Sequence, residues 1–114
     1  MADLSEHFDR SEFACKCGCG FDTVDAGLLQ ALEAIRSHFD AAVYISSGCR
    51  CESWNLSSGG GDSSQHLLGR ASDITVAGYL PEQVAIFAEA IGLGGIGRYE
   101  TFTHIDSRND KARW

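Results

Sequence analysis

Hydrophobic residues recur at helical spacing in two segments of the chain. Between Thr23 and Phe39 they lie three or four residues apart, which predicts an amphipathic helix that Thr23 or Asp22 caps. Pro81, which is tolerated in a first helical turn, begins a second such segment that reaches about Ile91. The apolar positions are Val24, Leu28, Leu32, Ile35 and Phe39 in the first segment, and Val84, Phe87, Ala88 and Ile91 in the second.

Shorter apolar stretches predict four strands. These strands are Val43–Ser46, Ala71–Val76, Gly95–Tyr99 and Phe102–Ile105. The segment from Cys49 to Ser64 is rich in Gly, Ser and Asn, which predicts a loop. Strands and helices mix without a regular alternation, so we expect the α+β class. The length of 114 residues fits one domain over 1–114, in which 1–20 form an N-terminal arm and a Cys-rich loop.

The charge balance narrows the range of partners. The net charge is -7, which disfavours a nucleic acid and an anionic lipid surface, because both require clustered Lys and Arg. No stretch is apolar enough to span a membrane, and Met1–Arg10 lacks the pattern of a secretory leader. We therefore expect a monomer that is made in the cytoplasm, with no nucleic-acid partner and no membrane insertion.

Five cysteines form two Cys-x-Cys groups. They are Cys15, Cys17, Cys19, Cys49 and Cys51. An odd number cannot pair completely within one chain, and without a leader reduced thiols or a metal site are more natural than disulfides. Four of these thiolates could hold a structural zinc ion. A disulfide and plain buried thiols are the alternatives.

Two further segments carry residues that suit a metal. Gly69 allows a turn between His66 and Asp73, and strand alternation places His104 and Asp106 on one face of their strand. Two His and one carboxylate suit zinc, and three protein ligands leave a fourth position for water. Taken singly, His104 would more often be an ordinary strand histidine, and Asp73 could simply cap a turn.

The spacing Ser64-x-His66-x-x-Gly69-x-Ala71-x-Asp73, followed by His104, resembles the zinc D-Ala-D-Ala carboxypeptidase family. The similarity extends to Ser5–Phe8, Ser11–Phe13, Ile45–Arg50, Phe102–Asp106 and Arg113–Trp114. The family shares its fold with the hedgehog signalling domain, which implies a small antiparallel sheet with helices on one side. The most similar members are short peptidoglycan peptidases, often encoded by phages or prophages. The zinc ligands that the resemblance implies are His66, Asp73 and His104.

The resemblance also implies residues that face the substrate. Arg50 matches the family arginine, which would hold a peptide carboxylate or polarise the scissile carbonyl. The alternative for Arg50 is a surface salt bridge to Asp62 or Glu52. Ser64 would hydrogen-bond substrate or a ligand, and a bond from its own loop backbone is the alternative.

The general base is where the chain departs from the family. Relatives carry an acidic residue three positions before the last zinc histidine, where this chain has Thr101. Glu100, one residue earlier, would serve as the base if the loop bends, and we favour it over Asp106. Asp106 would then support His104, because a metal-bound imidazole usually donates its other N–H to an acceptor.

The resemblance implies a zinc metallopeptidase acting on the cell wall. Its substrate would be peptides with D-amino acids in bacterial peptidoglycan, cut as a carboxypeptidase or as an endopeptidase. With no leader in the chain, the enzyme would act after release from the cell or on a phage particle. The alternative is a non-catalytic zinc-containing module that binds the cell wall or forms part of a phage.

Overall fold

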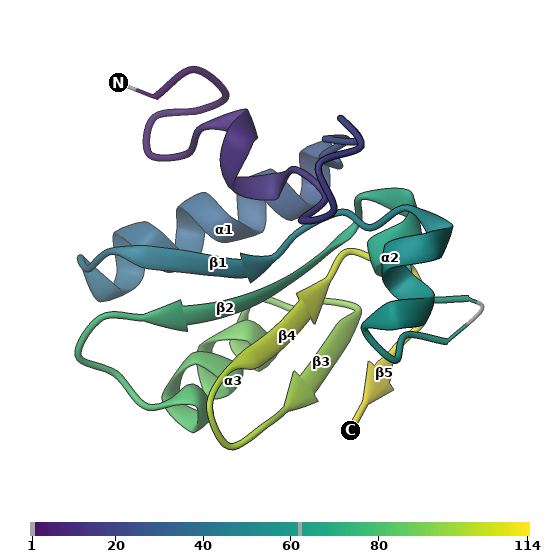
Figure 1. Ribbon diagram of the computed structural model, residues 1–114. Helices are drawn as coiled ribbons and strands as arrows, with labels where there is room; N and C mark the ends of the chain where they lie inside the picture. Colours follow the sequence, from purple (N-terminus) through teal and green to yellow (C-terminus); the bar gives the residue numbers. More distant parts are fainter. Residues whose placement is uncertain (1, 62) are drawn as a thin grey trace.

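In the part of the chain that the structure describes, five strands form one sheet, and two helices cover one of its faces (Figure 1). The computed structural model describes residues 2–61 and 63–114. The strands are β1 (Val43–Ser47), β2 (Ala71–Val76), β3 (Gly95–Arg98), β4 (Thr103–Asp106) and β5 (Ala112–Arg113). The helices are α1 (Ala26–Phe39), α2 (Glu52–Ser57) and α3 (Pro81–Ala90), with short 3-10 helices η1 (Arg10–Phe13) and η2 (Gln65–Leu68). This confirms the α+β class.

The strand order across the sheet is β1-β2-β4-β3-β5. All neighbouring strands are antiparallel except β3 and β5, which are parallel. In the β2–β4 ladder Asp73 lies opposite His104, and Ala71 lies opposite Asp106. Because side chains alternate between the two faces of a sheet, this register presents Asp73 and His104 together on one face. The antiparallel expectation is confirmed apart from β5, which the pattern of apolar residues did not predict.

The hydrophobic core lies between the sheet and the helices α1 and α3. Buried members include Leu28, Leu32, Ile35, Ile74, Val76, Val84, Ala88, Ile96 and Ile105. The predicted apolar face of α3 is correct at Val84 and Ala88 but wrong at Ile91, which is 39% exposed. Ala85 is buried instead, because α3 ends at Ala90 and Ile91 is already outside the last helical turn.

The first helix begins three residues later than expected. Its N-cap is Asp25 and not Thr23 or Asp22, because the Asp25 carboxylate accepts a hydrogen bond from the backbone N–H of Leu28. The Ser107 hydroxyl donates to the same carboxylate at 2.7 Å. No helix in the described part of the chain has both the length and the apolar character that crossing a bilayer requires.

Helix α2 lies within the segment that we expected to be a loop. The Cys51 sulfur caps its first turn by accepting a hydrogen bond from the backbone N–H of Trp54. The prediction of a loop over Cys49–Ser64 is therefore wrong for Glu52–Ser57. Figure 1 shows α2 at the end of the sheet, outside the layer that α1 and α3 form.

Candidate metal centre

The side chains of His66, Asp73 and His104 converge on one point. They come from η2, β2 and β4, respectively, and all three are buried. One donor atom from each lies within 4.8 Å of the others. His66 Nε2 is 3.3 Å and His104 Nδ1 is 3.0 Å from Asp73 Oδ1. The structure thus brings together the three residues that the sequence motif singles out.

The turn between His66 and Asp73 depends on Gly69. Its φ of 67° is left-handed, and a Cβ there would overlap the backbone carbonyl of Thr23. Glycine alone meets both conditions without strain. At the other end of η2, the Ser64 hydroxyl accepts a hydrogen bond from the His66 backbone N–H at 3.3 Å. Both ends of this short helix therefore fix the position of His66.

Each imidazole has one nitrogen toward Asp73 and the other on a separate acceptor. His66 Nδ1 lies 2.6 Å from the carbonyl oxygen of Gly48. His104 Nε2 lies 2.8 Å from Asp106 Oδ2. A metal-bound histidine typically donates its second N–H in this way, which fixes the tautomer and the ring orientation. The donor set of two imidazole nitrogens and one carboxylate oxygen therefore fits a zinc ion.

The electrostatics of the centre favour a bound cation. Burial raises the pKa of Asp73, but hydrogen bonds from His104 and His66 outweigh it and lower that pKa to about 2. Burial lowers the pKa of His104, yet hydrogen bonds to Asp106 and Asp73 raise it above its ordinary value. The two carboxylates thus favour positive charge at this point, whether on the His104 ring or on a bound divalent ion.

Arg108 is a component of the centre that the sequence analysis missed. Its Nε donates to Asp106 Oδ1 at 2.8 Å and its Nη2 to Oδ2 at 2.7 Å. Hydrogen bonds from His104 and Arg108 hold the pKa of Asp106 below its ordinary value against the effect of burial. Gly95 lies opposite Asp106 in the ladder, and a Cβ there would overlap the carboxylate. The spacing of Arg108 two residues after Asp106 is the signal that was available.

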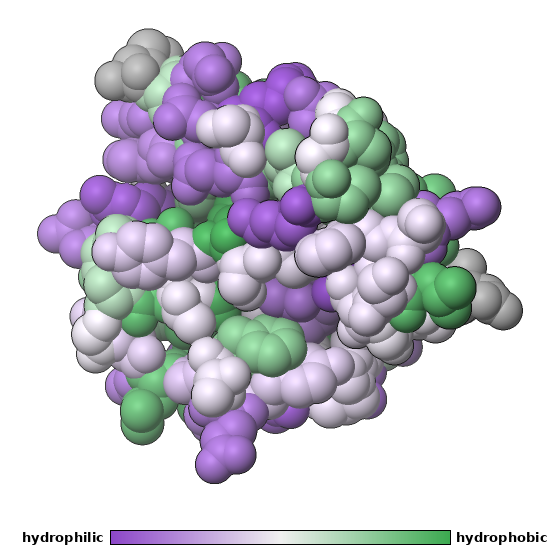
Figure 2. All heavy atoms as spheres, viewed as in Figure 1, coloured by the Kyte–Doolittle hydropathy of each residue, from purple (hydrophilic) through white to green (hydrophobic). Residues whose placement is uncertain are grey.

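An open cleft of about 440 Å³ lies over the three side chains. Figure 2 shows hydrophilic residues in a hollow of this face, between the strands and α2. The Gly-rich segment from Ser58 to Gly61 borders the cleft on one side. The aromatic residues of its wall are Tyr99, Phe102 and Trp114. The cleft thus leaves the buried donor atoms accessible from one side.

Arg50 and Ser64 both line this cleft. Arg50 Nη2 donates to Asp73 Oδ2 at 3.3 Å, and its Nε donates to the Ser47 hydroxyl at 3.1 Å. Its ion pair is therefore with Asp73 in the site, and Asp62 lies outside the described residues. The Ser64 hydroxyl makes the backbone contact that was its alternative, and its role toward substrate stays a prediction.

The two candidates for the general base lie in different surroundings. Glu100 is exposed in the turn between β3 and β4, and its side chain is not part of the cleft wall. Its neighbours Tyr99 and Phe102 are part of that wall. Asp106 is fully buried behind His104, with its oxygens held by His104 and Arg108. The structure thus places Asp106 beside His104 and leaves Glu100 outside the cleft wall.

The cysteines also separate into two groups. The sulfur atoms of Cys15, Cys17, Cys19 and Cys51 lie within 4.8 Å of one another. Cys49 is buried apart from them, and its thiol donates to the carbonyl oxygens of Phe13 and Phe21. These four cysteines are therefore a further group of side chains whose positions could suit a metal ion, with Cys49 outside it.

Comparison with known families agrees with this geometry. A family model described as Peptidase M15 matches residues 6–106. The match includes His66, Asp73 and His104 and extends from the N-terminal arm to the end of β4. A comparison with curated proteins found no match.

Proposed function

The chain belongs to the Peptidase M15 family, a family of zinc-dependent peptidases, and we propose that its substrate is a peptide containing D-amino acids in bacterial peptidoglycan. The observation that carries the proposal is the convergence of His66, Asp73 and His104 under an open cleft. The protein would act as a monomer. Its route to the cell wall, by release from the cytoplasm or on a phage particle, stays a prediction.

The residues around the centre have distinct roles in this reaction. His66 Nε2, Asp73 Oδ1 and His104 Nδ1 would hold the zinc ion. A bound zinc ion supplies a Lewis acid for the scissile carbonyl and lowers the pKa of water to about 7. Arg50, whose guanidinium lies beside Asp73, would stabilise the negative charge that develops on that carbonyl oxygen.

Internal cleavage is the form of the reaction that we favour. A carboxypeptidase needs a cationic group to bind the free carboxylate of its substrate. Of the two arginines in the cleft wall within residues 2–61 and 63–114, Arg108 is paired with Asp106, and Arg50 beside Asp73 is assigned to the scissile carbonyl, which leaves neither for a free carboxylate. Glycines, which have no side chain, border one side of the cleft, and this would leave space for a chain that continues past the reacting bond.

Purified peptidoglycan tests the activity and the bond together. We expect the zinc-loaded protein to release muropeptide fragments whose masses identify the cut bond. Treatment with a chelator should abolish the release, and added zinc should restore it, because metal-free protein lacks the Lewis acid. Mass spectrometry of the soluble products measures this outcome. Loss of a single terminal D-Ala would show that a carboxypeptidase, and not the endopeptidase that we favour, is correct.

A non-catalytic zinc module is the competing proposal. It predicts that protein with a full zinc content co-sediments with peptidoglycan and releases no fragment. It also predicts that chelation lowers the thermal unfolding temperature, while no turnover is measured either with or without zinc. These outcomes together would refute the peptidase proposal for this chain.

We propose Glu100 as the general base, acting when its turn closes over a bound substrate. Apo structures often hold catalytic carboxylates at longer distances than the reactive complex does. Glu100→Gln should keep its zinc and lower kcat by about 10²–10⁴-fold, the usual contribution of a general base. Steady-state kinetics and metal analysis of the same preparation measure both effects.

The matched control is Glu6→Gln, which removes an exposed carboxylate of the N-terminal arm. It should leave kcat unchanged, since Glu6 is not part of the cleft wall. An unchanged kcat in Glu100→Gln would remove Glu100 from the mechanism and leave Asp106 as the candidate.

A further inference from the structure

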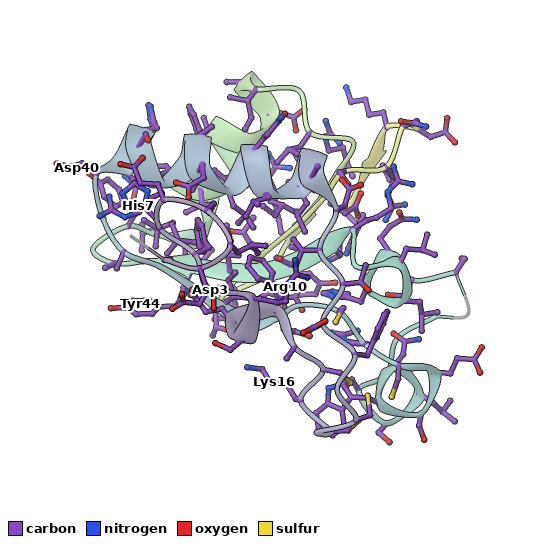
Figure 3. The ribbon with its side chains drawn as sticks, turned by 90° about the horizontal axis from the view of Figure 1, so that it is seen from above. Asp3, His7, Arg10, Lys16, Asp40 and Tyr44 are labelled. Carbon is purple, nitrogen blue, oxygen red and sulfur yellow. The ribbon has the colours of Figure 1, made fainter. Side chains whose placement is uncertain are left out.

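Four thiols gather where the N-terminal loop meets the start of α2. Figure 3 shows the sulfur atoms between the loop that carries Lys16 and this helix. Cys15 Sγ lies 3.4 Å from Cys17 Sγ and 3.8 Å from Cys51 Sγ, and Cys17 Sγ lies 3.6 Å from Cys51 Sγ. Cys19 Sγ lies within 4.8 Å of all three. The four residues come from segments more than 30 positions apart, so the fold itself assembles the cluster.

The sulfur spacing matches a tetrahedral metal site. With Zn–S bonds of about 2.3 Å, neighbouring sulfurs of a tetrahedron are about 3.8 Å apart. The three distances between Cys15, Cys17 and Cys51 are close to this value. All four thiols are free, and a disulfide would occupy only two of them. A single ion that binds all four accounts for the whole arrangement.

Backbone N–H groups already point at the sulfurs. The Cys51 N–H lies 3.4 Å from Cys15 Sγ, and the Trp54 N–H lies 3.5 Å from Cys51 Sγ. Such contacts orient metal ligands and offset the negative charge of thiolates. Gly18 and Gly20 have φ of 81° and 91°, which glycine adopts without strain. These two residues therefore allow the loop to turn so that its three thiols lie on the same side.

We propose that Cys15, Cys17, Cys19 and Cys51 bind a structural zinc ion, with Cys49 excluded from the site. Four sulfur ligands close the coordination sphere, so this ion has no open position for a substrate. Binding releases the thiol protons to solvent. The buried Cys49 stays a packing residue, because its thiol already donates to the Phe13 and Phe21 carbonyls.

The position of this zinc ion connects it to the catalytic cleft. Cys51 directly follows Arg50, whose backbone N–H donates to the His66 carbonyl at 2.9 Å. The ion would tie the N-terminal loop to this point of the chain. Arg50 is thereby held beside Asp73, and the structural zinc acts as a positioning element for the cleft. This consequence rests on the proposed peptidase function, whereas the zinc site itself does not.

Metal analysis of protein purified with a reductant and without a chelator tests the site. We expect two zinc ions per chain in the unaltered protein and one in Cys17→Ser/Cys19→Ser. Both substituted cysteines are exposed, so the change leaves the core intact. Replacement of zinc by cobalt(II) should give strong near-ultraviolet thiolate absorption, and the double variant should lose it. The variant should also show a lowered kcat with a smaller change in KM, because Arg50 is no longer held where the negative charge develops in the transition state.

Two variants separate this proposal from the catalytic zinc. Cys49→Ala should keep two zinc ions and the cobalt absorption, because its thiol is not a ligand. His66→Ala should keep one zinc ion and the cobalt absorption, because it removes only the other site. An unchanged zinc content in Cys17→Ser/Cys19→Ser, or no thiolate absorption with cobalt in the unaltered protein, would overturn the structural site. Loss of the cobalt absorption in Cys49→Ala would overturn the ligand set.

Discussion

His66→Ala should remove the catalytic zinc ion and, with it, the peptidase activity. The variant deletes one of the three ligands, so that only Asp73 and His104 remain. Asp73 then forms an ordinary ion pair with Arg50. Zinc polarisation supplies several kcal/mol of transition-state stabilisation, and each 1.4 kcal/mol is tenfold in rate. We therefore expect a loss of at least about 10²-fold in kcat/KM. Metal analysis should show one zinc ion fewer per chain.

The matched control is His38→Ala. His38 is exposed near the end of α1, where its ring stacks on Phe87 at 3.9 Å between centroids. Its removal should leave the zinc content and the activity unchanged. A full zinc content in purified His66→Ala would disprove the ligand assignment, and with it the mechanism that depends on that ion.

The sequence predicted the elements that depend on local patterns. Strand β2 has the predicted bounds, because its apolar residues alternate with residues of the other face. Helix α2 was missed because the segment is polar and short, and its cap is a cysteine sulfur in place of a usual hydroxyl or carboxylate. Strand β5 has only two residues and forms through parallel pairing with β3, a long-range contact with no local signal.

The candidate site divides in a similar way. The motif identified His66, Asp73 and His104, because the spacing of a turn and the alternation of two strands decide where they point. Residues that act through contacts were harder to find. The acceptor for His66 Nδ1 is the backbone carbonyl of Gly48, and a sequence motif cannot identify a backbone group, because every residue has one. Arg108 lies outside any strand, and its spacing of two residues from Asp106 does not by itself show that the two side chains pair.

The cysteines show how geometry chooses among alternatives that the sequence left open. The sequence did not indicate which four of the five cysteines would bind an ion, so Cys49 and Cys51 were equally good candidates. In the fold the two have different partners, because the Cys49 thiol donates to the Phe13 carbonyl, whereas the sulfur of Cys51, the N-cap of α2, lies against Cys15 and Cys17. The spacing of two residues therefore does not decide whether the two thiols share a site, because each sulfur is placed by its own contacts.

Asp106→Asn should weaken both zinc binding and the fold. The buried carboxylate accepts from His104 Nε2, from Arg108 Nε and Nη2 and from the Arg108 backbone N–H. An amide of the same size has one oxygen, so its NH₂ must face at least one of these donors. Leaving such a donor unpaired in a buried pair costs about 3 kcal/mol of unfolding free energy. The zinc affinity should fall about 10–100-fold, as expected when the acceptor of a metal-bound histidine is lost.

Denaturant unfolding with and without zinc, together with a competitive chelator titration, measures the two effects of Asp106→Asn. Asp110→Asn is the matched control, because it removes an exposed carboxylate four residues further along the chain and should change neither quantity. If Asp106 also served as the base, the fully zinc-loaded Asn variant would lose kcat by as much as Glu100→Gln. If it only orients His104, saturating zinc should restore most of kcat, since the ligand nitrogen Nδ1 remains directed at Asp73. We expect this restoration, and a variant that stays inactive with its zinc site filled would transfer the role of base from Glu100 to Asp106.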